Sequence, residues 1–492
     1  MDIVSLLMRS LQGGAGNLAA YLAAHVLLCL VPAFFIAGAM TALIPKESVT
    51  RFLGRDAPKF VSYPAAALSG SVLAVCSCTI VPLFAGIYRK GAGLGPAITF
   101  LFFAPAANIL ALAYTGTVIG ADLAVARLLL SLVFGIGIGM IMALIFRREE
   151  IARDEASDAL FAQKGSLGRP AAVFLLILVA LLLSGTLKFG LLTQVYGQVT
   201  LPIAGMDRVQ EILAQWVPFD ASKGEEGVTA QGAILIGLLV LIGVTAWLGL
   251  EKILEGFNRW TGVCLGLVAL TLLTAAVGMR PHAGGLDILL TGRFFAVALA
   301  LLLLAYVGRT HLKGREVQDW LWESWRFVKQ IFPLLVVGVF AVGIIRQFIR
   351  PEWIQSLAGS NTVLGNFAGV VFGVFMYFPT LVEVPIANMF LGLGMHRGPL
   401  LAYLMADPEL SLQSILMISA IIGRAKAWTY VAWVALFSTL AGWIYGAWVD
   451  GASLWLLGLY LVAFLSLLSL GLCLTGRQSA KVRAARRAHA SD

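Results

Sequence analysis

Long apolar segments alternate with short polar loops along nearly the whole chain. About 20 apolar residues suffice to cross a bilayer as a helix, so each long segment predicts one membrane span. The apolar segments of the two ends and of the middle are near residues 17–44, 61–88, 96–119 and 121–146, then 170–192, 230–250, 260–279 and 291–308, then 330–349, 361–391, 398–422, 427–447 and 454–475. The pattern predicts an all-α polytopic membrane protein.

Prolines and glycines recur at a fixed distance of 303 residues in the two ends of the chain. The matching pairs are Pro82 and Pro385, Pro96 and Pro399, Pro105 and Pro408, Gly70 and Gly373, Gly91 and Gly394, Gly95 and Gly398, and Gly120 and Gly423. A proline inside a helix removes a backbone hydrogen bond and breaks or kinks the helix. Paired broken helices in two repeats point to the binding site of a transporter. The alternative is two independent helix breaks in a glycine-rich membrane protein.

The distribution of basic residues favours two repeats of opposite orientation. The loops 147–169 and 309–329 and the tail from residue 477 each hold five Lys or Arg, which places all three in the cytoplasm. This requires that 361–391 and its counterpart 61–92 enter and leave the bilayer on one side, as re-entrant half-helices broken by proline. The two repeats are then inverted relative to each other; the alternative is a parallel repeat with the tail outside.

These boundaries divide the chain into seven parts. They are 1–147 (first permease repeat), 148–169 (cytoplasmic loop), 170–308 (central four-helix insertion), 309–329 (cytoplasmic loop), 330–447 (second repeat), 448–476 (final transmembrane helix) and 477–492 (basic cytoplasmic tail).

Composition excludes several functional classes. Only 12% of the residues are charged and 60% are hydrophobic, whereas a soluble domain carries about 25% charged residues. The net charge of +9 comes from loops that flank the spans, so it does not indicate a nucleic-acid partner. No GxxxxGK[ST] phosphate-binding loop occurs, which argues against ATP-driven pumping by this chain alone. We expect no resident cofactor.

Cys76, Ser77 and Cys78 form the sharpest local motif, next to Pro82. In a helix break both thiols could face one cavity, and soft thiolates favour soft partners. Cys76 and Cys78 are therefore candidate ligands of a thiophilic solute, although C-x-C alone is a weak metal motif. The alternative is a pair of small packing residues.

Polar groups near the paired breaks complete the predicted site. Glu383 is ionisable within an apolar stretch, which is a functional hypothesis by default, and we expect it to carry a coupling proton. Asn108 and Asn388 could line the same cavity. Asp407, Glu409 and Ser411 look like a helix cap with acidic residues that start a new helix; the alternative is contact with the substrate, for which Ser411 is the candidate. Arg127, six residues inside its span, either snorkels or pairs with a buried carboxylate.

Two stretches resemble the ArsP/YraQ-like permeases of bacteria. They are VCSCTIVPLFAGIYRKGAGLGPAITFLFFAPAANILAL and DPELSLQSILMISAIIGRAKAWTYVAWVALFSTLAGWIYG, within residues 20–147 and 325–447. The resemblance implies a multi-span inner-membrane permease, and characterised members export trivalent organoarsenicals such as methylarsenite. It assigns importance to the segment 76–82, Gly95-Pro96, Pro105 with Asn108, and Asp407-Pro408 with Ser411. The four central spans are not a feature of the shorter organoarsenical exporters.

The sequence thus predicts a bacterial inner-membrane secondary transporter with a cytoplasmic C-terminus. Its expected partners are the lipid bilayer and a small thiophilic substrate. A homo-oligomer, or an accessory subunit docked on residues 170–308, is left open. Two alternatives remain: a permease for an unrelated small solute, and a membrane thiol-disulfide oxidoreductase that uses Cys76 and Cys78. The oxidoreductase would need a second cysteine pair as electron relay, and the other three cysteines are isolated.

Overall fold

The chain folds into a largely helical membrane protein. The computed structural model describes residues 3–24, 28, 30–54, 57–73, 77–160, 168–187, 190–202, 205–217, 227–282, 285–346, 348, 351–375 and 383–453, with isolated positions between 455 and 466. Within these residues, eight helices are long and apolar enough to cross a membrane, or nine if one bent helix pair counts as a span. The predicted polytopic fold is confirmed.

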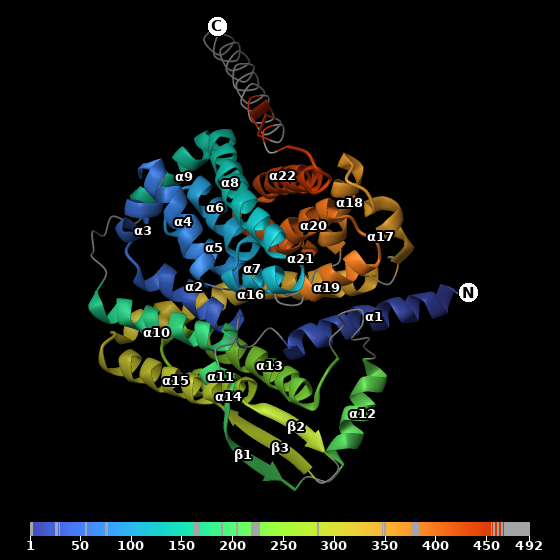
Figure 1. The fold of residues 1–492 in the computed structure, drawn as a ribbon. Coiled ribbons are helices and arrows are strands. Elements are labelled where there is room, and N and C mark those ends of the chain that lie inside the picture. Colours follow the sequence, from blue (N-terminus) through green and yellow to red (C-terminus); the bar gives the residue numbers. More distant parts are fainter. Residues whose placement is uncertain are drawn as a thin grey trace.

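The two ends of the chain contain matching helices (Figure 1). The first end holds α1 (Ile3–Ala24), α2 (Val31–Leu43), α3 (Lys46–Leu53), α4 (Lys59–Leu73), α5 (Ser77–Arg89), α6 (Leu94–Ala106), α7 (Ile109–Val118), α8 (Ala121–Ile145) and α9 (Arg147–Leu160). The second holds α16 (Gly314–Arg346), α17 (Pro351–Ala358), α18 (Val363–Phe375), α19 (Glu383–Gly392), α20 (Arg397–Leu410), α21 (Leu412–Ile422) and α22 (Arg424–Val449). Helices α6, α7 and α8 begin at residues 94, 109 and 121, and α20, α21 and α22 begin 303 residues later, at 397, 412 and 424.

The middle of the chain forms a separate bundle with a small sheet. Its elements are α10 (Arg169–Thr186), α11 (Gly190–Thr193), β1 (Val195–Leu201), α12 (Met206–Trp216), α13 (Ala230–Gly249), η3 (Ile253–Glu255), α14 (Arg259–Ala276), β2 (Gly278–His282), β3 (Gly285–Thr291) and α15 (Gly292–Thr310). Helices α10, α13, α14 and α15 are all span candidates. The strands pair antiparallel in the order β1-β3-β2, which the sequence reasoning did not anticipate.

The long helix α16 joins the two bodies. One hydrophobic core combines residues from both ends of the chain, and a second fills the central bundle. Leu321 and Trp325 of α16 belong to the second core, whereas Leu335 and Val339 further along the same helix belong to the first. In Figure 1 the central bundle and its sheet lie on one side of α16, and helices α4, α6 and α8 lie on the other side together with α18, α20 and α22.

Three expectations about individual segments need comment. The apolar segment 17–44 was expected to be one span, but the chain forms two helices there, α1 and α2. The described part of α4 ends at Leu73 and that of α5 begins at Ser77, and residues 74–76 lie outside the described residues; Pro82, at which the break was expected, is inside α5. Most of the predicted span 454–475, and the whole basic tail, lie outside the described residues.

Short helices flank both predicted re-entrant points. Helices α4 and α5 have 15 and 13 residues, and α18 and α19 have 13 and 10. Each is shorter than the roughly 20 residues that a single crossing needs. Within the described residues α4 packs on α6 and α8, whereas α5 packs on α2 and α6. The re-entrant arrangement stays a prediction that these lengths favour.

Candidate functional site

Each half also has a helix break between two later helices, α6 and α7 in the first half and α20 and α21 in the second. Polar side chains lie at both of these breaks. Helix α6 ends at Ala106, and α7 begins after Asn108, whose Oδ1 accepts a hydrogen bond from the Leu110 amide at 2.9 Å. Helices α20 and α21 meet at Ser411 with a bend of 46°. Pro105 and Pro408 lie in the last turns of α6 and α20. Because proline cannot continue the backbone hydrogen bonding, each helix ends within three residues of it.

A buried ion pair connects the two halves beside the first break. The Arg127 Nη2 atom on α8 lies 2.7 Å from Oε1 of Glu383, and both side chains are fully buried. Arg127 Nε also donates to the carbonyl of Ala106 at 2.8 Å, and its Nη1 lies 3.5 Å from the Thr115 hydroxyl. Arg127 is thus held by one residue of the second half and two of the first.

Helix termini stabilise both charges of this pair. Glu383 is the first residue of α19, where the helix dipole favours an anion. Ala106 is the last residue of α6, where unpaired carbonyls and the dipole favour a cation. The short α19 therefore presents a carboxylate, and the broken α6 an acceptor, to one guanidinium. Removing a single partner of a buried ion pair typically costs about 3–5 kcal/mol, because the other charge stays buried and uncompensated.

The equivalent place in the second half carries a different polar pair. Tyr430 stands 303 residues after Arg127, and Glu409 stands 303 residues after Ala106. The Tyr430 hydroxyl donates to Oε2 of Glu409 at 2.6 Å, and both side chains are buried. Oε1 of Glu409 has no hydrogen-bond partner among the described residues.

Further buried polar groups surround the break between α20 and α21. Asp407, Ser411, Gln413 and Ser414 are each at most 1% exposed, and the Ser411 hydroxyl donates to that of Ser414 at 2.7 Å. Helix α7 packs against α19, and α5 packs against α21, so each break faces a short helix of the other half. The centre of the molecule is therefore polar and acidic, although apolar helices enclose it.

The structure brings some of the predicted site residues to the helix breaks and the ion pair, but not others. Asn108 and Ser411 lie at the two breaks and Glu383 lies in the ion pair, whereas Asn388 is on the exposed face of α19. Pro82 is buried inside α5.

The thiol motif cannot be placed in the same detail. Cys76 lies outside the described residues, as do the side chains of Ser77 and Cys78, whose backbone begins α5. Among the residues described, no group of three or more His, Cys, Asp or Glu is placed to hold a metal ion.

Sequence reasoning found part of the polar centre and missed part. Pairing with a buried carboxylate was one of two readings for Arg127, and the contact with Glu383 shows that this reading is right. Glu409 was read as a residue of a new helix, but it lies inside α20 and is buried. No local sequence pattern marks Tyr430 as a site residue. It could have been predicted only from the offset of 303 residues that relates it to Arg127.

Comparisons with known proteins identify the family. Residues 12–447 match the model of a family described as predicted permease, ArsP_1. The chain is 31% identical to the UPF0718 protein MJ0584 of Methanocaldococcus jannaschii over 453 residues, which cover 91% of this chain and 98% of that protein. It is 28% identical to the UPF0718 protein YraQ of Escherichia coli over 130 residues, 26% of this chain and 37% of that protein. No solved structure matches. The chain is therefore a multi-pass membrane protein that belongs to the ArsP_1 family of predicted permeases.

Proposed function

We propose that this permease is a secondary transporter that exports a small thiophilic solute, such as a trivalent organoarsenical, across the inner membrane. The observation that carries the proposal is the buried Arg127–Glu383 pair, which joins the halves where α6 is broken and α19 begins. Charged groups inside the membrane are costly, and they mark substrate and ion pathways. Broken helices at the meeting of two repeats are the usual place for such a pathway.

Contacts between α8 and α22 support an inverted relation between the halves. Phe134 and Phe437, which are 303 residues apart, pack edge to face with ring centroids 4.9 Å apart. At one end, Tyr445 near the end of α22 donates to Asp122 near the start of α8 at 2.8 Å. At the other end, Lys426 near the start of α22 contacts Glu150, just beyond α8, at 2.8 Å. Equivalent helices that run in opposite directions fit two repeats related by an axis in the membrane plane.

Glu383 carries the coupling proton in this proposal. While Glu383 is ionised, its contact with Arg127 ties α19 of one half to α8 of the other. Protonation removes the negative charge, so the ion pair is replaced by a weaker hydrogen bond from the guanidinium to a neutral carboxyl group, while the contacts of Arg127 with the Ala106 carbonyl and the Thr115 hydroxyl remain. The halves can then separate. Cys78 in the first turn of α5 and Cys76, one residue before α5 in the sequence, contact the solute in this proposal, because thiolates bind soft acceptors. Helix α5 itself packs against α21 of the other half.

The test is transport of methylarsenite into everted membrane vesicles under a proton gradient. We expect Glu383→Gln to reduce energised uptake at least tenfold, because it leaves Arg127 without its anion and removes the titrating group. The double variant Arg127→Gln with Glu383→Gln leaves no uncompensated charge, so it should recover thermal stability but not uptake. Glu352→Gln on the exposed face of α17 is the matched control. Normal uptake by the double variant would contradict the coupling role.

A second pair of variants tests the solute class. Cys76→Ser with Cys78→Ser should weaken methylarsenite uptake and leave the protein folded, since neither substitution introduces a charge. Full uptake by this variant would remove the thiols from the mechanism. Absence of methylarsenite uptake by the unsubstituted protein would contradict the substrate class while leaving its membership of the permease family intact.

A further inference from the structure

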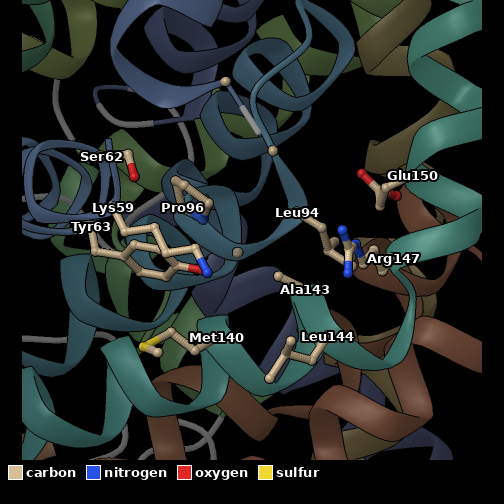
Figure 2. A pocket seen from close by; sticks show the side chains of 13 residues that line it. Lys59, Ser62, Tyr63, Leu94, Pro96, Met140, Ala143, Leu144, Arg147 and Glu150 are labelled. Atoms are coloured by element: carbon tan, nitrogen blue, oxygen red, sulfur yellow. The ribbon is translucent and has the colours of Figure 1, made fainter. Parts of the chain in front are cut away.

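A cavity of about 300 Å³ opens between α4, the start of α6 and the end of α8 (Figure 2). Its lining residues include none of the residues at the helix breaks that form the candidate substrate site. Lys59 of α4 and Arg147 at the start of α9 line it, and both side chains are exposed. A third charged residue in its wall is Glu150.

The charge of Glu150 is compensated by neighbours, so the cavity is net positive. Lys426 lies 2.8 Å from Oε1 of Glu150, and Arg153 lies 3.1 Å from Oε2. The Tyr88 hydroxyl also donates to Oε1, at 2.7 Å. Lys426 and Arg153 balance the charge of Glu150, although its Oε2 has no hydrogen-bond partner among the described residues. Lys59 and Arg147 are therefore the charges that a ligand would meet. Two cations in one concave site favour an anion.

The start of α6 adds anion-binding groups. Gly93, Leu94, Gly95 and Pro96 line the cavity, and they are the N-cap and the first three residues of this thirteen-residue helix. Gly93 provides no side-chain cap and its own amide donates to the Leu53 carbonyl at 2.8 Å, and Pro96 has no N–H. The amides that this helix start can offer a ligand are therefore those of Leu94 and Gly95. Such amides, with the positive end of the helix dipole, bind phosphate and similar anions.

Two buried hydroxyls also line the cavity. Ser62 and Tyr63 are only 1% and 5% exposed, and both side chains line the cavity. Buried hydroxyls normally find a hydrogen-bond partner. Here the cavity offers room for one, in addition to the amides of α6.

One wall of the cavity is apolar and belongs to a membrane span. Met140 and Leu144, one turn apart on α8, line it and are 42% and 56% exposed. Because α8 is a span of 25 residues, these exposed apolar side chains face hydrocarbon. A ligand that fills the cavity therefore needs an anionic head and an apolar tail.

In the second half, the positions 303 residues after the cavity-lining residues carry side chains that bond to one another. Asn366, which stands 303 residues after Tyr63, donates to Oδ1 of Asn361 at 2.8 Å. Asn361 in turn donates to the carbonyl of Trp443 at 3.1 Å. The position equivalent to Arg147 is Asp450, an anion. The open, basic cavity is thus a property of the first half and not of the repeat.

We propose that this cavity binds the phosphate headgroup of an anionic phospholipid. Lys59, Arg147 and the amides of α6 hold the phosphate, Ser62 and Tyr63 hydrogen-bond to the headgroup, and the acyl chains lie along Met140 and Leu144. The basic loops around the cavity place it at the cytoplasmic leaflet, where basic pockets between membrane helices bind such headgroups. This lipid site is independent of the proposed substrate and coupling residues.

The experiment compares lipid binding by the purified full-length protein and its variants, using native mass spectrometry and thermal unfolding. Phosphatidylglycerol should be retained and should raise the unfolding temperature, whereas phosphatidylcholine should not. Lys59→Ala with Arg147→Ala should weaken retention at least tenfold. Ala143→Phe, which fills the cavity without changing its charge, should do the same. Lys313→Ala with Arg315→Ala, on the exposed surface of another basic loop, is the control.

Three results would overturn the proposal. The first is equal retention of phosphatidylglycerol by the unsubstituted protein and the Lys59/Arg147 variant. The second is an equal loss in the Lys313/Arg315 control, which would indicate non-specific attraction to basic loops. The third is equal stabilisation by inorganic phosphate alone, which would indicate a site for a free anion instead of a lipid.

Discussion

The polar centre uses the same two positions of the repeat for different chemistry. Arg127 of the first half binds the carbonyl of Ala106 and reaches Glu383, whereas Tyr430 of the second half binds the side chain of Glu409. One half therefore contributes the cation, and the other half contributes three buried carboxyl groups, those of Glu383, Glu409 and Asp407. A single guanidinium cannot balance all three if they are ionised. Carboxyl groups that outnumber the cation favour binding of protons, and this supports the proposed proton coupling.

Tyr430→Phe tests how far Glu409 depends on its neighbour. The substitution removes the hydroxyl that donates to Oε2 of Glu409 and leaves a buried carboxyl with no described partner. Leaving such a group unsatisfied costs about 1–3 kcal/mol, so the unfolding temperature in detergent should fall. Tyr306→Phe, on the exposed side of α15, is the control. Equal unfolding temperatures for the two variants would contradict the dependence, and adding Glu409→Gln to Tyr430→Phe should recover part of the loss.

The functional importance of a charged residue was predictable from the sequence where that residue lies within an apolar stretch. Glu383 and Arg127 stand out because an ionisable group in an apolar stretch is costly. Glu409 was harder to predict, because it directly follows Pro408, and an acid after a helix-ending proline usually lies at the start of the next helix. Its burial depends on α22, which supplies Tyr430 from 21 residues later in the chain. Local patterns contain no information about that contact.

At the scale of helices, the same close crossing occurs in both halves. Helix α6 meets α8 through Gly95 and Gly139, and α20 meets α22 through Gly398 and Gly442. The two glycines of the second pair stand 303 residues after those of the first pair. A Cβ atom on Gly139 would lie 2.6 Å from the Gly95 carbonyl oxygen, and one on Gly442 would lie 2.5 Å from that of Gly398. Small residues allow such close backbone approach between membrane helices.

Gly139→Ala should therefore destabilise the first half by about 1–3 kcal/mol, the usual cost of overpacking. The backbone of α6 has to move, because the nearest atoms include a carbonyl and cannot rotate away. Gly137→Ala on the same helix is the matched control, since its Cβ would meet Phe437 at an ordinary 3.8 Å. Thermal unfolding of both variants in one detergent measures the difference. A smaller loss in Gly139→Ala than in Gly137→Ala would contradict the crossing.

Sequence periodicity predicted the membrane spans better than the connections between them. The four central spans near 170–192, 230–250, 260–279 and 291–308 correspond to α10, α13, α14 and α15, because long apolar segments need no distant partner to be recognised. The sheet was missed because its strands are short and β1 pairs with residues about 90 positions later, as Val199 does with Ile288. Proline correctly indicated the breaks after Pro105 and Pro408, where α6 and α20 end, whereas Pro82 lies inside α5.

For the whole molecule, the central question is the orientation of the two halves. Phe134 and Phe437 are equivalent residues that touch each other, which is the contact expected on a two-fold axis. Asp122 near the start of α8 contacts Tyr445 near the end of α22, and Glu150, just beyond the end of α8, contacts Lys426 near the start of α22. The two helices therefore run antiparallel. The repeat offset was readable from glycine and proline positions, whereas this antiparallel contact required a structure.

Cysteine labelling at equivalent positions tests the inversion directly. Ala121 begins α8 and Arg424 begins α22, and both side chains are exposed. If the halves are inverted, a membrane-impermeant thiol reagent should label Arg424→Cys only in everted vesicles and Ala121→Cys only in intact spheroplasts. Asp450→Cys, at the far end of α22, should follow Ala121→Cys, since one 26-residue helix separates it from Arg424. The unsubstituted protein gives the background from its own cysteines. Labelling of Ala121→Cys and Arg424→Cys from the same side would require parallel repeats, and the proposed meeting of two oppositely oriented helix breaks would then fail.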